Sequence, residues 1–148
     1  LNTGDIGYMV DGVLTITGRK KDLIIIHGRN IWPQDLEHIA EAEPEVRSGD
    51  AVAFSVPDHE GEEVCVLLVQ CRETDTNKRN NLVRRLSALM RLEMSLDCYV
   101  ELVPPRSLPK TSSGKLSRAK ARLDFISAHA EREQSPFADE LNLKVASA

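Results

Sequence analysis

The apolar run VCVLLV at residues 64–69 decides the fold that we expect for this chain. Neither of its faces carries a charged side chain, which is typical of a strand inside a sheet. A partner strand is expected at residues 51–56, joined to it by the turn-rich segment PDHEG at residues 57–61. The run YVELV at residues 99–103 predicts a third strand, and Pro104 ends it.

Three amphipathic helices are expected beside these strands. The first begins at Pro33, which suits a first helical turn, and ends before Pro44. Its apolar positions are Leu36, Ile39 and Ala40. The second places apolar residues at i, i+4, i+7 and i+8, namely Leu82, Leu86, Leu89 and Met90. The third is expected to turn one face to the core, formed by Ala119, Leu123, Ile126 and Ala130.

The N-terminal part predicts a hairpin, a polar joint and one more strand. Asp11 and Gly12 lie between two apolar runs, and an Asp-Gly pair there is a strong signal for a two-residue hairpin turn. The charged joint GRKKD at residues 18–22 leads into a strand at residues 23–26, which Gly28 ends. We therefore expect an α/β (α+β) fold in which an N-terminal β-hairpin precedes a small mixed sheet with about three packed helices.

The same pattern divides the chain into four parts. Residues 1–17 are expected to hold the end of a preceding region and the hairpin, and residues 18–22 a hinge. Residues 23–133 are expected to form one compact domain. Residues 134–148 show no periodicity, and we expect a disordered tail or a linker. Because the first residue is Leu1 rather than Met, we interpret the chain as a fragment.

Composition argues against several classes of protein. A net charge of −4 and 4% aromatic residues disfavour a nucleic-acid binder, which is usually basic. We expect neither a signal peptide nor a membrane span, because no apolar run approaches the roughly 18–20 residues that cross a bilayer. The four histidines lack the spacing of metal ligands, so no metal site is expected. Three cysteines without C-x-x-C spacing predict buried thiols and a reducing, cytoplasmic setting: Cys65, Cys71 and Cys98.

The segment LPKTSSGKLSR at residues 108–118 carries the sharpest chemical signal. Its Thr, Ser and Gly residues predict a loop that ends in Lys115 just ahead of a helix. An ammonium there can reach a phosphate or carboxylate oxygen, and such a charge-assisted hydrogen bond contributes roughly 1.5–3 kcal/mol. A nucleotide-binding P-loop is excluded, because Pro109 replaces its first Gly and Leu116 its metal-binding Ser or Thr. A solvated turn with an exposed lysine remains the alternative.

Two further segments each allow two interpretations. The joint at residues 18–22 fits a hinge, since hinges are a few loop positions that absorb a change in backbone angles, or a charged surface turn. In TGDIG at residues 3–7, Asp5 is able to bind sugar hydroxyls, but Asp beside Gly is also common in turns.

Together these segments resemble the adenylate-forming superfamily, whose members include acyl-CoA synthetases, luciferases and peptide-synthetase adenylation domains. The resemblance rests on TGD, on GRKKD about fifteen residues later, and on P-x-x-x-x-G-K-x-x-R at residues 109–118. Residues 22–37, DLIIIHGRNIWPQDLE, are most similar to fatty acyl-AMP ligases, which typically read DLIIxxGRNxYPQDIE. Acyl-CoA synthetases more often show a K-x-x-G pattern here, followed by P-x-E-I-E. Trp32 in place of Tyr is a mild departure that keeps an aromatic ring.

The resemblance implies that residues 23–133 are the C-terminal subdomain of such an enzyme and assigns roles to single residues. Asp5 is expected to hold the ribose hydroxyls of ATP, assisted by Arg19, and Lys21 is expected to be the hinge. Lys115 is expected to be the catalytic lysine that reaches the acyl carboxylate and the α-phosphate of ATP. After domain rotation, the thiol-acceptor side is expected to include Gly28, Arg29 and Asn30.

The implied reaction joins a fatty acid to ATP·Mg²⁺, giving acyl-AMP and pyrophosphate, and then passes the acyl group to a thiol. In fatty acyl-AMP ligases that thiol is the phosphopantetheine arm of an acyl carrier protein. ATP and Mg²⁺ are expected to be bound mainly by the enzyme's N-terminal domain, so the chain alone should be inactive. The alternatives are an acyl-CoA synthetase, a peptide-synthetase adenylation domain, or a non-catalytic module that docks carrier proteins.

A basic stretch in the second predicted helix offers one more hypothesis. Carrier proteins are acidic, so a basic helix face would steer them electrostatically, although a solvated helix face is the alternative. The basic residues, which have no acid between them in sequence, are Lys78, Arg79, Arg84, Arg85 and Arg91.

Overall fold

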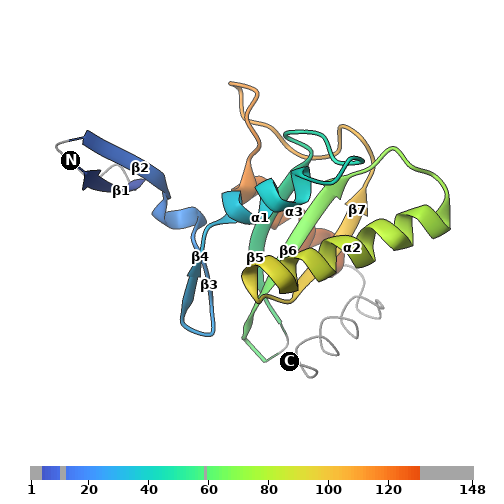
Figure 1. The fold of residues 1–148 in the computed structure, drawn as a ribbon, viewed down its shortest axis with the longest axis horizontal. Coiled ribbons are helices and arrows are strands. Elements are labelled where there is room, and N and C mark those ends of the chain that lie inside the picture. Colours follow the sequence, from blue (N-terminus) through green and yellow to red (C-terminus); the bar gives the residue numbers. More distant parts are fainter. Residues whose placement is uncertain (1–4, 11–12, 59, 131–148) are drawn as a thin grey trace.

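The computed structural model describes residues 5–10, 13–58 and 60–130. A three-stranded sheet lies at the centre, in the order β5-β6-β7 (Figure 1). β5 runs antiparallel to β6, whereas β7 runs parallel to it, so the sheet is mixed as expected. The strands are β5 (Ala51–Pro57), β6 (Glu63–Gln70) and β7 (Cys98–Val103). The apolar run at residues 64–69 thus forms the central strand.

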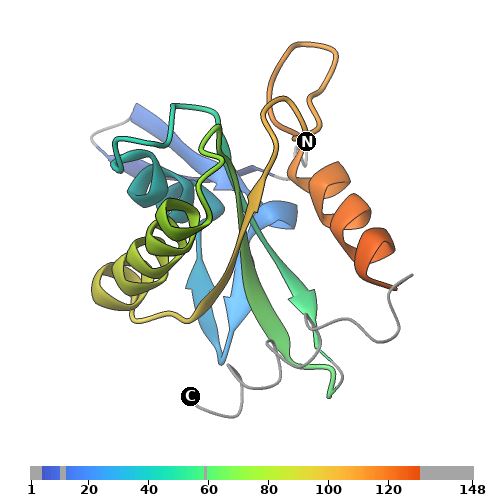
Figure 2. The same cartoon turned by 90° about the vertical axis from the view of Figure 1, so that its right-hand side faces the viewer.

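Alternating side chains of the sheet serve two apolar cores. In β6, Cys65, Leu67 and Val69 point to one face, while Val66 and Leu68 point to the other. Figure 2 shows α1 and α2 on one side of the sheet and α3 on the other, so the domain has three layers. The helices are α1 (Pro33–Glu41), α2 (Thr76–Met94) and α3 (Arg118–Ala130).

Local sequence explains where the helices begin and end. Pro33 occupies the first turn of α1, as predicted. Asp75 caps the start of α2, where its carboxylate accepts a 3.0 Å hydrogen bond from the Lys78 N–H. α2 ends at Ser95, which adopts the left-handed conformation with φ 49°. The next N–H, from Leu96, reaches back to the carbonyl of Met90, which completes a Schellman-type cap.

Two hairpins precede α1. The expected N-terminal hairpin pairs β1 (Asp5–Val10) with β2 (Val13–Arg19), and its Asp-Gly turn lies outside the described residues. A 3₁₀ turn, η1 (Lys20–Asp22), follows at the polar joint. The second hairpin joins β3 (Ile24–Ile26) to β4 (Arg29–Ile31), and the sequence analysis did not anticipate β4.

The turn between β3 and β4 leaves little sequence signal for β4. His27 and Gly28 both have positive φ, 50° and 75°, as a tight two-residue hairpin turn requires. Gly28 therefore ends β3, as predicted, but it also starts a return strand. That strand buries only Ile31 of its three residues, which is too little alternation to recognise from sequence.

The predicted inner face of α3 is wrong at Ala119 and Leu123, which are exposed, whereas Ile126 packs against the core as expected. Leu123, which was expected to face the core, is 60% exposed, whereas Ala121 and Phe125 are buried against the sheet. Two arginines one turn apart set the rotation of the helix, because both reach partners on the domain body. Arg118 binds Glu37 of α1, and Arg122 donates to the Ser55 carbonyl of β5.

The three cysteines are buried free thiols, as predicted. Cys65 and Cys98 are register partners on β6 and β7, and their sulfur atoms lie 3.0 Å apart. None of the helices in the described ranges combines the length and apolarity that a bilayer crossing requires. The predicted tail at residues 134–148 lies outside the described residues.

Candidate functional site

Lys115 lies on a hydrogen-bonded loop between β7 and α3. Lys110 and Leu116 form an antiparallel bridge across its base, and the Thr111 N–H donates to the Lys115 carbonyl over 2.7 Å. At the tip, the Gly114 N–H donates to the Thr111 carbonyl over 2.9 Å, with Gly114 at φ 83°. Figure 2 shows this orange loop projecting from the body of the domain. Backbone hydrogen bonds at its base and tip therefore give the loop a defined turn geometry.

A buried glutamine fixes the base of this loop to the sheet. Gln70, at the end of β6, accepts a 3.1 Å hydrogen bond from the N–H of Leu108, and both side chains are 6% exposed. Its amide nitrogen in turn donates to Asp50 over 2.8 Å. A polar residue at the end of an otherwise apolar strand is the sequence signal for this anchor, although no role was predicted for Gln70.

The Lys115 side chain itself is exposed and forms no ion pair or hydrogen bond with any residue that the structure describes. Its ammonium is therefore available to an anion outside this domain. Ser117 then caps the start of α3, where its hydroxyl accepts a 3.3 Å hydrogen bond from the Lys120 N–H. A cation on a fixed loop beside a capped helix start suits the contact with a phosphate or carboxylate that the sequence predicts.

Arg118 joins the start of α3 to two other segments. Its Nε and Nη2 each donate to the Glu37 carboxylate over 2.7 Å, and its Nη1 lies 3.5 Å from Asp22. The hydrogen bonds that Arg118 donates to Glu37 raise the pKa of Arg118 more than its partial burial lowers it. Local sequence gives no signal for the contact between Arg118 and Glu37, because the two residues lie 81 positions apart.

The structure places the other predicted nucleotide-side residues around the polar joint. Asp5 and Arg19, both expected at the ATP site, are register partners across the β1–β2 hairpin. Lys21, the expected hinge, is exposed within η1, and the next residue, Asp22, is largely buried beside Arg118. Asp5 thus lies at the start of the hairpin and Arg19 where the hairpin enters the joint, whereas Lys115 lies on the domain that follows the joint.

The residues expected on the thiol-acceptor side share the β3–β4 hairpin. Gly28 lies in the turn, and Arg29 and Asn30 follow it as exposed residues. The Arg29 guanidinium donates to the carbonyls of Ser95 and Met94, over 2.9 and 2.6 Å, at the end of α2. A cation at a helix C-terminus interacts favourably with the helix dipole. Arg29 therefore ties the hairpin to α2 in this structure, beside a hollow of about 140 Å³.

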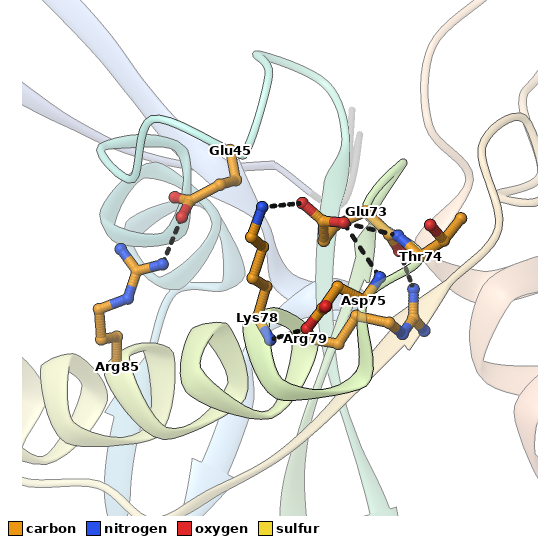
Figure 3. A network of polar contacts seen from close by, with 7 residues as sticks. All are labelled: Glu45, Glu73, Thr74, Asp75, Lys78, Arg79 and Arg85. Carbon is orange, nitrogen blue, oxygen red and sulfur yellow. Dashed lines mark hydrogen bonds and ion pairs between the residues drawn. The ribbon is translucent and has the colours of Figure 1, made fainter.

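The basic residues of α2 are largely paired with acids from outside the helix. Figure 3 shows Arg85 directed at Glu45 and Lys78 at Glu73. Arg91 forms an ion pair with Asp97, and Arg79 donates to the Glu73 carbonyl. The hydrogen bond from Arg85 lowers the pKa of Glu45. Acids thus offset the charges of Lys78, Arg85 and Arg91, whereas Arg79 contacts backbone carbonyls and Arg84 forms no ion pair with a described residue. Two of the five cations in the carrier-steering hypothesis therefore have no acidic partner among the described residues.

No three His, Cys, Asp or Glu side chains cluster to hold a metal ion within the described part of the chain.

No protein-family model matches the chain. The "Putative acyl-CoA synthetase" of Caulobacter vibrioides is 50% identical over 127 residues, which cover 85% of this chain and 22% of that protein. The medium-chain-fatty-acid–[acyl-carrier-protein] ligase JamA of Moorena producens is 39% identical over 130 residues, with the same coverage, 85% and 22%.

One solved structure is similar to this chain in both fold and sequence. It comes from a study of fatty acyl-adenylate ligases from E. coli and L. pneumophila and superposes with a TM-score of 0.80 at 50% identity. The match covers 88% of this chain and 23% of that chain. The chain therefore spans about a fifth of the length of the proteins that it resembles.

Proposed function

Because this chain belongs to the adenylate-forming enzymes and has the fold of their C-terminal subdomain, we propose that it is the mobile C-terminal domain of a fatty acyl-AMP ligase. The parent enzyme activates a fatty acid with ATP to form acyl-AMP and pyrophosphate. It then passes the acyl group to the phosphopantetheine thiol of an acyl carrier protein. The cell compartment proposed for it is the cytoplasm.

The environment of Lys115 is the observation that carries this proposal. Attack of a fatty-acid carboxylate on the α-phosphate brings two anions together, and a preorganised cation stabilises the charge of that transition state. Lys115 offers such a cation on a hydrogen-bonded loop, with no competing partner among the described residues. ATP and Mg²⁺ are proposed to be bound mainly by the N-terminal domain of the enzyme, with Asp5 and Arg19 contributing at the ribose.

Rotation about Lys21 would exchange the two ends of this domain at the active site. The Lys115 loop would leave after adenylation, and the β3–β4 hairpin with Gly28, Arg29 and Asn30 would arrive for acyl transfer. Conformational steps of this kind commonly separate two half-reactions in one enzyme.

Two observations support a carrier protein as the acceptor of the acyl group. They are the sequence of residues 22–37 and the names of two similar proteins. JamA is named as an acyl-carrier-protein ligase, and the matched structure comes from work on fatty acyl-adenylate ligases. The Caulobacter relative bears an acyl-CoA synthetase name, and this favours free CoA as the second candidate.

Competition between the two thiols tests the proposal in the complete enzyme that carries this chain. The enzyme is given ATP, a series of fatty acids, and either CoA or a phosphopantetheinylated carrier protein. We expect acyl-AMP with several chain lengths and acyl transfer to the carrier protein in preference to CoA. Preferred acyl-CoA formation would identify a synthetase instead, and absence of acyl-AMP with every fatty acid would favour a non-catalytic docking module.

A further inference from the structure

One guanidinium connects the parts of this domain that the proposed reaction must move together. Arg118 follows Lys115 by three residues and opens α3. It binds Glu37 of α1 through two hydrogen bonds of 2.7 Å and lies 3.5 Å from the carboxylate of Asp22. The side chains of Arg118, Glu37 and Asp22 are only 21%, 11% and 16% exposed.

This buried cluster is not explained by stability alone. Taking charges out of water costs several kcal/mol per ion, so a buried ion pair often adds little over apolar packing. What the cluster supplies is geometry, because the bidentate contact fixes the guanidinium plane against α1. Glu37 is itself fixed, since its Oε1 also accepts a 3.1 Å hydrogen bond from the Ala53 N–H of β5.

Anchoring changes abruptly at the polar joint. Lys21 is exposed and has no ion-pair or hydrogen-bond partner among the described residues, whereas Asp22 is held against Arg118. A hinge consists of the few positions whose backbone angles are free to change. The anchored Asp22 side chain therefore limits that change to Lys21 and the residues before it, where no described side-chain contact holds Lys21 to the domain.

Resting on the function proposed above, we propose that Arg118 is a positioning residue that sets the pivot of the hinge. By holding Asp22 and the start of α3 to the same point on α1, it makes Lys115 and the C-terminal side of the hinge move as one rigid body. Rotation about Lys21 then moves the Lys115 ammonium by the full angle, because the chain between them does not bend.

Arg122 offers a matched control on the same helix. It lies one turn after Arg118, and both arginines line a groove of about 440 Å³. Like Arg118, it is hydrogen-bonded to the body of the domain. Its Nε donates to the Ser55 carbonyl over 2.8 Å, and it contacts neither Glu37 nor Asp22 in the contacts described. Substitution of Arg122 therefore perturbs α3 and the groove but removes none of the contacts of Arg118 with Glu37 and Asp22.

Hydrogen exchange on the full chain tests the anchor without reference to any reaction. In the wild type, the backbone amides of Asp22 and Leu23 should exchange more slowly than that of Lys21. Asp22→Asn and Arg118→Lys should each accelerate exchange at Asp22 and Leu23 by about tenfold, since each weakens the anchoring contact. Arg122→Lys should leave these two amides unchanged. Equal protection in all four proteins would overturn the proposal.

The two half-reactions of the complete enzyme give the second measurement. Arg118→Lys and Asp22→Asn should each lower kcat for acyl-AMP formation by about tenfold, with KM for ATP and fatty acid nearly unchanged, because the loss is one of alignment. Transfer from preformed acyl-AMP should fall less, and Arg122→Lys should leave both rates within about twofold of wild type. The double variant should be no slower than the slower single variant, since both act through one contact.

Three outcomes separate the ideas. Equal losses in both half-reactions, or multiplicative losses in the double variant, would overturn the positioning role. An exchange boundary that moves as expected in a protein that forms no acyl-AMP would support the anchor and refute the proposed function. Wild-type adenylation in Arg118→Lys, together with an unmoved boundary, would refute the anchor and leave the proposed function standing.

Discussion

Glu37 covers the outer edge of β5 at Ala53, where its Oε1 accepts a 3.1 Å hydrogen bond from the backbone N–H. Two residues further along the strand, the Ser55 carbonyl accepts a 2.8 Å bond from Arg122. In an antiparallel pair, alternate residues point both backbone groups away from the partner strand. Unpaired edges promote association with other strands. Side chains from α1 and α3 thus occupy the groups through which another strand would pair with β5.

The first prediction concerns this carboxylate. Glu37→Ala removes both short hydrogen bonds of Arg118, which keeps only the 3.5 Å contact with Asp22, and leaves the Ala53 N–H without its acceptor. The free energy of unfolding should therefore fall by about 3 kcal/mol. The partial exposure of Arg118 places the loss at the lower end of the range for broken buried pairs. Urea unfolding measures it. The control is Glu41→Ala on the same helix, which loses one exposed bond to Gly49 and should cost about 1 kcal/mol. Equal losses would contradict the edge-covering role.

The second prediction separates stability from catalysis at Lys115. Lys115→Ala should leave the urea midpoint unchanged, because the side chain is exposed and contacts no described residue. In the complete enzyme it should abolish most acyl-AMP formation while largely sparing transfer from preformed acyl-AMP. Pyrophosphate release and thioester formation measure the two steps. Lys110→Ala, an exposed lysine at the base of the same loop, is the control. Equal loss of both steps would exclude the assigned half-reaction.

The central sheet could be predicted almost completely, because its signals are local. Residues 51–56, 64–70 and 99–103 correspond to β5, β6 and β7 within a residue or so. Apolar runs bounded by turn residues carry that information in the sequence itself. The motif residues of the site were likewise visible, because the loop around Lys115 has a distinctive composition.

The rotation of α3 and the environment of its arginines could not be predicted. Its sequence carries two apolar stripes, one through Leu123 and one through Phe125, and local periodicity does not choose between them. The choice is made by the contacts of Arg118 and Arg122 with Glu37 and Ser55, which lie 81 and 67 residues away. Pairing across such distances appears only when the layers are assembled.

The third prediction concerns the hydrogen bonds by which Arg29 holds the β3–β4 hairpin to the end of α2. Arg29→Ala removes two hydrogen bonds to the last carbonyls of α2, so the free energy of unfolding should fall by about 1 kcal/mol at this exposed site. Exchange of the amides at residues 24–31 should accelerate, because the hairpin loses its tie to the helix. Mass-spectrometric hydrogen exchange reports both effects locally. Asn30→Ala is the neighbouring control. Identical exchange in the two variants would show that the Arg29 hydrogen bonds do not hold the hairpin to α2.

The fourth prediction follows from Glu45, whose pKa is lowered by its hydrogen bond from Arg85. A carboxylate with a lowered folded-state pKa stabilises the fold above its unfolded pKa of about 4.3, and this stabilisation is lost as pH falls through the folded value. The difference in urea midpoint between wild type and Glu45→Gln should therefore be constant above about pH 5 and shrink below about pH 4.

Two controls accompany the acid titration. Arg85→Gln should give a larger difference that also shrinks at acidic pH, because Arg85 pairs with Glu43 as well as with Glu45. Added salt should reduce the difference at neutral pH, since the Glu45 side chain is 41% exposed and its charge is screened. A midpoint difference that stays the same from neutral to acidic pH would show that the pair does not couple folding to protonation.

The last prediction uses the buried thiols as a probe of the central sheet. The contact with Cys98 and burial both raise the pKa of Cys65 well above its usual value, and only the thiolate is nucleophilic. Cys65, Cys71 and Cys98 are 0%, 4% and 2% exposed, so iodoacetamide should not modify them in the folded chain at about pH 8. In guanidinium chloride all three should react, as mass spectrometry would show. Rapid native modification of Cys65 alone would mean that β6 and β7 separate far more often than their buried pairing predicts.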